Sequence, residues 1–184
     1  EQTGEKGSRK KTSHHWFDAV SRTVQLPKDG GDGTVAWEFA DPSLLIPLIL
    51  SKSSKLQDKY DLALRDHPCS PQSPWNLIIG FDEFAPGDKL KTSNHKKTMC
   101  LYLNFVELGH AALSQAATWF VPTAVRTDTC KEVSGGWAYM LAVFLKRIML
   151  GASGFATAGI PVVINGSPVL LFANLKILIS DGDG

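Results

Sequence analysis

The sequence predicts an α/β protein of the α+β type, in which a mixed β-sheet follows a helical appendage. Short runs rich in β-branched and aromatic residues occur at 75–81, 98–106 and 175–179, as expected for strands buried in a core. Apolar residues recur with a helical period over 132–150. With 43% hydrophobic and 20% charged residues among 184, the chain has the composition of a globular domain with a substantial core.

Composition shifts along the chain divide it into three segments. Residues 1–33 are expected to form a polar tail and a short helix that Ser13 caps. Residues 34–74 are expected to form a helical appendage, which ends in a linker with three prolines between His67 and Pro74. Residues 75–184 are expected to hold the sheet.

The appendage contains clear start signals for two helices. A strand is expected over 34–39, after which Asp41 caps a helix with Pro42 in its first turn. Pro47 is expected to bend or end that helix, because proline lacks the N–H that the helix interior requires. A second helix is expected over 54–66, where apolar residues recur four apart.

The strand at 75–81 ends in two adjacent carboxylates, Asp82 and Glu83. Because side chains alternate across a strand, the two carboxylates are expected on opposite faces. A carboxylate at the tip of a core strand is costly unless it is solvated, hydrogen-bonded or bound to a cation. Asp82 therefore either opens a turn or takes part in a site.

The remaining elements of the core follow from pattern and turn residues. Strands are expected over 98–106 and 117–126, the second at a sheet edge or bulge because of its proline. The helix over 132–150 is expected to be capped by Ser134. An Asn-Gly turn predicts a hairpin within 159–172.

A last strand over 175–179 also leads into acids, Asp181 and Asp183. Three antiparallel strands, a crossover helix and a strand that returns beside the first form a permitted topology. This topology would place Asp181 beside Asp82, on strands about 4.8 Å apart. Two carboxylates so close repel each other and require a shared divalent cation, for which oxygen ligands favour Mg²⁺ or Mn²⁺.

This order of elements, with acids ending the first and fourth strands, resembles the ribonuclease-H-like core of DDE/D transposases. Within these it is most similar to the CACTA (En/Spm-like) group. The similarity covers residues 75–184 and rests on the patterns at 77–103 and 177–182. It implies a Mg²⁺- or Mn²⁺-dependent enzyme that acts on the phosphodiester bonds of DNA, in the nucleus.

Carried over to this sequence, the resemblance makes Asp82 the first catalytic acid and Asp181 the second, with Glu83 and Asp183 as further candidates for the metal. The third acid of the family lies on a later helix, beyond the 184 residues. We therefore expect a C-terminally truncated core, or a decayed copy, that is inactive as it stands.

The most basic stretch lies between the first two core strands. It contains four lysines against one aspartate: Lys89, Lys91, Lys96 and Lys97. Such a loop either is simply solvated or contacts the phosphates of DNA. The net charge of +1 indicates no basic field over the whole chain.

Two other classes of function remain open. The second hypothesis is a non-catalytic α/β domain that binds DNA or a protein partner, and the third is an enzyme that acts on a small molecule in a deep apolar pocket. Three cysteines without zinc-site spacing indicate reduced thiols in an intracellular protein. The uncharged stretch at 148–175 contains too many glycines and prolines for a membrane helix, so no membrane partner is expected.

Overall fold

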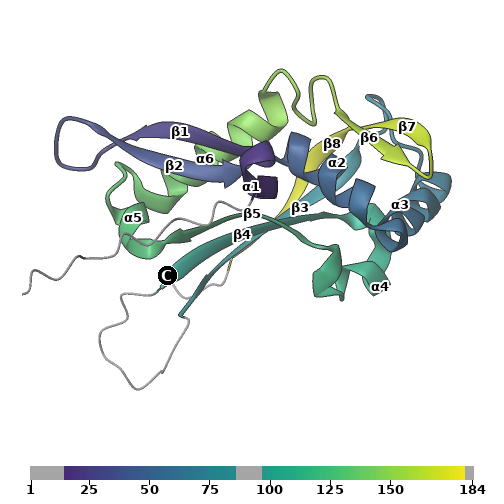
Figure 1. Ribbon diagram of the computed structural model, residues 1–184, viewed down its shortest axis with the longest axis horizontal. Coiled ribbons are helices and arrows are strands. Elements are labelled where there is room, and N and C mark those ends of the chain that lie inside the picture. The colour runs from purple at the N-terminus through teal and green to yellow at the C-terminus, as the bar shows by residue number, and fades with distance from the viewer. Residues whose placement is uncertain (1–14, 86–96, 181–184) are drawn as a thin grey trace, which may run out of the picture.

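The structure is a computed structural model that describes residues 15–85 and 97–180. In the N-terminal part the elements are α1 (His15–Val20), β1 (Ser21–Pro27), β2 (Thr34–Ala40), α2 (Pro42–Lys52) and α3 (Ser54–Asp66). In the remainder they are β3 (Trp75–Phe84), β4 (Thr98–Phe105), α4 (Gly109–Leu113), β5 (Phe120–Arg126), α5 (Thr127–Lys131), α6 (Gly136–Leu150), β6 (Ile160–Ile164), β7 (Ser167–Leu171) and β8 (Ala173–Ser180). Short 3₁₀ turns, η1 (Val106–Leu108) and η2 (Ala116–Thr118), flank α4. The α+β class predicted from sequence is confirmed (Figure 1).

The central sheet has four strands in the order β5-β4-β3-β8. β3 pairs antiparallel with β4, and β4 pairs antiparallel with β5. β8 returns after α6 and pairs parallel with β3, so that Phe81 lies opposite Ser180. The predicted return of the last strand beside the first is thus confirmed.

The outer strand β8 is exposed along most of its length. Leu175, Ile177, Leu178 and Ile179 keep between 39% and 51% of their surface accessible. A bulge at Lys176 shifts the register between its first and second halves. Both faces of this strand therefore present apolar side chains to solvent.

The hairpin of β1 and β2 packs on the central sheet, and the sequence had predicted only β2. The Trp37 indole Nε1 donates a hydrogen bond to the Thr123 hydroxyl of β5 at 3.3 Å. Its ring also packs on Phe144 of α6, with centroids 6.4 Å apart. Figure 1 shows the hairpin running alongside α6. The expected boundary between residues 33 and 34 falls inside this hairpin, and one cluster of buried residues joins it to the core.

α6 is the long helix that packs on the face of the central sheet from which Phe81 projects. It buries Met140, Phe144 and Ile148. It begins at Gly136, later than the predicted start at 132, and Ser134 does not cap it. Gly135 occupies the cap position instead, with a left-handed φ of 80° that suits glycine. The preceding residues form the separate helix α5 and an isolated bridge between Val133 and Lys28, which follows β1, and this takes Ser134 out of the cap position.

The other local predictions hold with small shifts. Asp41 caps α2 as expected, but Pro47 does not end the helix, which continues to Lys52. Proline there removes only one helical bond, while the residues around it remain buried. β5 starts at Phe120 rather than 117, because the 3₁₀ turn η2 occupies the residues before it.

The second hairpin, β6 and β7, turns through Asn165 and Gly166 with φ values of 47° and 83°, as the Asn-Gly signal predicted. The helix predicted over 54–66 is confirmed as α3. In the described part of the chain, no helix is both long and apolar enough to cross a bilayer.

Candidate functional site

Asp82 lies within β3 rather than beyond it, because the strand extends to Phe84. Its neighbour Phe81 faces α6 and packs on Trp137, with ring centroids 6.0 Å apart. Asp82 therefore projects from the opposite face of the sheet, where it lies across from Cys100 of β4. Its side chain is half-buried, and the described residues provide it with no hydrogen bond or ion pair. Burial raises the pKa of the Cys100 thiol, and the negative charge of Asp82 raises it further.

Two aromatic residues form the surface beside Asp82. Gly80, on the same face of β3, pairs with Tyr102, whose ring lies over the space that a Cβ on Gly80 would occupy. The Trp119 ring packs edge-on against Tyr102, with centroids 5.6 Å apart. Ile179 of β8 lies on the other side of Gly80 in the register. The carboxylate thus stands at the end of a half-open aromatic and aliphatic surface.

Glu83 points to the other face and has its own partners. Its Oε2 accepts a hydrogen bond from Lys97 Nζ at 2.6 Å, and its Oε1 accepts one from the Thr127 hydroxyl at 2.7 Å. These two hydrogen bonds hold the pKa of Glu83 below its usual value. The structure therefore does not bring Glu83 together with Asp82, and it links Lys97 to Glu83.

Several predicted site residues lie outside the described residues. These are Asp181, Asp183, Lys89, Lys91 and Lys96. Ser180, which directly precedes Asp181 in sequence, is described and pairs with Phe81, which directly precedes Asp82. Within 15–85 and 97–180, no group of three or more His, Cys, Asp or Glu side chains is placed to hold a metal ion.

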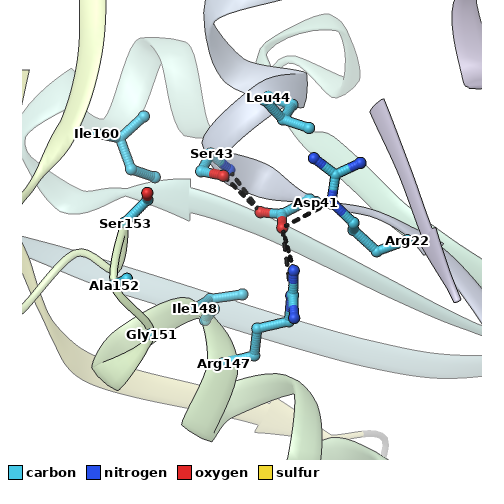
Figure 2. Close-up of a pocket in the computed structure, with 10 residues that line it drawn as sticks. All are labelled: Arg22, Asp41, Ser43, Leu44, Arg147, Ile148, Gly151, Ala152, Ser153 and Ile160. Carbon is cyan, nitrogen blue, oxygen red and sulfur yellow. Dashed lines mark hydrogen bonds and ion pairs between the residues drawn. The ribbon is translucent and has the colours of Figure 1, made fainter. Parts of the chain in front are cut away.

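A second polar cluster was not identified from the sequence, where Asp41 was predicted only as a helix cap. Its carboxylate also accepts hydrogen bonds from Arg147 of α6, at 3.2 Å from Nε and 3.1 Å from Nη2. Arg22 of β1 approaches the same oxygen to 4.0 Å. Figure 2 shows the three side chains converging at the rim of a cavity of about 320 Å³.

Comparisons with protein-family models, with curated proteins and with solved structures find no match to this chain. Function is therefore inferred from the positions and chemistry of Asp82 and the residues around it.

Proposed function

We propose that residues 75–184 form a ribonuclease-H-like, metal-dependent core that acts on the phosphodiester bonds of DNA, in the manner of CACTA-type DDE/D transposases. Asp82 and Asp181 are its proposed metal-binding and catalytic acids. The observation that carries the proposal is the parallel pairing of β8 with β3, in which Phe81 lies opposite Ser180. The residue that follows each of these two is an aspartate.

The strand order supports the same proposal. Three consecutive antiparallel strands, β3 to β5, precede the helix α6, and the next strand of the sheet, β8, returns parallel to β3. The β6–β7 hairpin is placed between α6 and β8 and pairs only with itself among the described strands. The hairpin therefore does not interrupt the order of four strands on which the resemblance to the ribonuclease-H-like core rests.

The environment of Asp82 fits a divalent cation. Its carboxylate is half-buried and has no cationic or hydrogen-bonding partner among the described residues, so its charge is available to a ligand. Carboxylate oxygens suit Mg²⁺ or Mn²⁺, whereas the neighbouring Cys100 is held in its thiol form by a raised pKa. A bound Mg²⁺ or Mn²⁺ would polarise a phosphate oxygen and lower the pKa of a bound water.

The other residues of the site have supporting roles in this proposal. The hydrogen bonds of Glu83 join the end of β3 to Lys97, before β4, and to Thr127, at the start of α5. This fixes the strand end that carries Asp82. Lys89, Lys91 and Lys96 are proposed to contact DNA phosphates, and Lys97 does so in addition to its bond to Glu83.

The proposal is tested by measuring Mn²⁺ binding with electron paramagnetic resonance, in which the signal of free Mn²⁺ falls as the ion binds. The wild-type chain is expected to bind Mn²⁺ saturably. Asp82→Asn and Asp181→Asn are each expected to weaken binding at least about tenfold, because each removes a charged ligand. Asp128→Asn is the matched control, since this acid is 61% exposed in α5 and lies outside the proposed site.

Binding of Mn²⁺ by Asp82→Asn that equals wild-type binding would refute the metal site. DNA binding that persists in that variant would then favour the alternative, a non-catalytic α/β domain that binds DNA. A gel-shift assay of Asp82→Asn with duplex DNA at two salt concentrations measures whether DNA binding persists. Binding through phosphate contacts is expected to weaken steeply as the salt concentration rises.

A further inference from the structure

The polar cluster around Asp41 is built from three elements that are distant in sequence. Arg22 comes from β1, Asp41 precedes α2, and Arg147 lies near the end of α6. Figure 2 shows the two guanidinium groups reaching the Asp41 carboxylate from different sides. Ser153 and Ile160 line the side of the cavity away from Arg22 (Figure 2).

The acceptors of Asp41 are already occupied. Oδ1 accepts from the backbone N–H of Ser43 at 3.0 Å and from its hydroxyl at 2.7 Å, while Oδ2 accepts from Arg147. Asp41 is the one carboxylate among the described residues that line the cavity. Two guanidinium cations and one carboxylate therefore leave one positive charge in excess at the cavity.

Donors remain on both arginines. A guanidinium carries five N–H groups, of which Arg147 commits Nε and Nη2 to Asp41. Arg22 donates from Nη1 to the Ser21 carbonyl oxygen. The two side chains stay 44% and 42% exposed, so part of each arginine side chain is accessible to a ligand.

We propose that this cavity binds a phosphate group. A tetrahedral phosphate presents oxygens in several directions and can accept from two guanidinium groups that approach from different sides, in the geometry arginine favours. A volume of about 320 Å³ is larger than a phosphate alone, and Leu44, Ile148 and Ile160 supply an apolar wall. The phosphate is therefore expected to carry an organic body.

This site is separate from Asp82. Phe81 packs on Trp137 at the first turn of α6, whereas Arg147 lies ten residues further along that helix. At 1.5 Å per residue the two positions are about 15 Å apart along α6. The inference therefore stands whether or not Asp82 binds a metal.

Isothermal titration calorimetry with inorganic phosphate tests the site. Wild-type protein is expected to bind phosphate saturably, and Arg22→Gln and Arg147→Gln to bind it at least about tenfold more weakly, because each loses charge-assisted hydrogen bonds. Arg65→Gln is the matched control, since Arg65 also pairs with an aspartate but lies on the exposed side of α3. Circular dichroism verifies that each variant is folded. If Arg147→Gln does not fold, Arg22→Gln alone tests the site.

Asp41→Asn separates a binding site from a purely structural ion pair. Asparagine keeps an oxygen for the Ser43 backbone N–H but removes the charge that competes with an anion. A phosphate site predicts that Asp41→Asn binds phosphate at least as tightly as wild type. No saturable binding by folded wild-type protein, or equal weakening in Arg65→Gln, overturns the proposal.

Two further titrations identify the source of the phosphate. A nucleoside monophosphate that binds more tightly than inorganic phosphate supports a small organic ligand that uses the apolar wall. A 12-base-pair DNA duplex that displaces phosphate, without any such gain for the mononucleotide, supports a nucleic-acid backbone. Both results support phosphate binding, whereas failure of both ligands to compete with phosphate contradicts an organic phosphate as the ligand.

Discussion

Gly80→Ala is expected to disturb the face of the sheet that carries Asp82. Gly80 lies in the middle of the central strand β3, where glycine is otherwise unfavourable. An added Cβ would lie 2.1 Å from Cε2 and 2.7 Å from Cδ2 of the Tyr102 ring. Ordinary carbon contacts are about 3.5 Å or longer. The ring would therefore have to move by more than about 1 Å.

The size of the effect follows from two opposing terms. Forcing a packed ring out of its position costs about 1–3 kcal/mol. Alanine in place of glycine raises the free energy of unfolding by about 0.5–1 kcal/mol, because it restricts the unfolded chain and suits a strand better. Subtracting the middle of one range from the middle of the other, we expect the free energy of unfolding of Gly80→Ala to fall by about 1 kcal/mol.

A double-mutant cycle with Tyr102→Ala isolates the contact. Once the ring is absent, Gly80→Ala is expected to be neutral or stabilising, which gives a coupling energy of about 1–3 kcal/mol. Urea unfolding followed by tryptophan fluorescence provides each free energy. Gly31→Ala is the control, because a Cβ on Gly31 meets nothing within 4 Å.

Two results would refute this reasoning. One is a Gly80→Ala variant as stable as wild type, which would mean that the ring does not cover the glycine. The other is the same loss of stability in the presence and absence of the Tyr102 ring, which would place the cost elsewhere in β3.

Three further predictions concern single side chains. Asp41→Ala should lower the free energy of unfolding by about 1–3 kcal/mol, because it removes the helix cap and the hydrogen bonds from Arg147. Asp41→Asn should lower it by about 1 kcal/mol or less, because asparagine can still cap the helix. Equal losses for the two variants in urea unfolding would contradict a capping role. Because the pKa of Glu83 is lowered from 4.5, its contribution to stability is present above that pH and is lost as pH falls through the folded pKa. Glu83→Gln should therefore show a smaller drop in urea midpoint than wild type between about pH 5 and pH 3, and identical pH profiles would exclude this linkage. Cys130 is 4% exposed and burial raises its pKa to about 11, so a thiol reagent should modify it only as urea unfolds the chain; rapid modification of the native protein would be inconsistent with its burial.

Local patterns in the sequence were enough to predict most of the sheet. β3, β4 and β8 carry short apolar runs, and the parallel return of β8 followed from the order of elements. Asp41 as a cap and the Asn-Gly turn of the second hairpin also depend on neighbouring residues alone. The pairing of Asp82 with Asp181 in one site stays a prediction.

The features that were missed depend on contacts distant in sequence. Apart from its proline, β1 has only two apolar residues, Val24 and Leu26, so its alternating pattern is too short to indicate a strand. Asp41 and Arg147 are 106 positions apart, and no periodicity connects them. α6 starts later than predicted because α5 and the bridge between Val133 and Lys28 take up the residues before Gly135.

The exposed strand β8 has a consequence for how copies of this chain behave in solution. One of its edges pairs with β3, and no other described strand pairs with the opposite edge, which Ile177, Leu178 and Ile179 flank. Lys176 is the single charge in the strand, whereas natural edge strands commonly use several charges, prolines or cover to prevent pairing. We therefore expect that, if two copies pair through their sheets, they do so along β8, and that such pairing would increase with protein concentration.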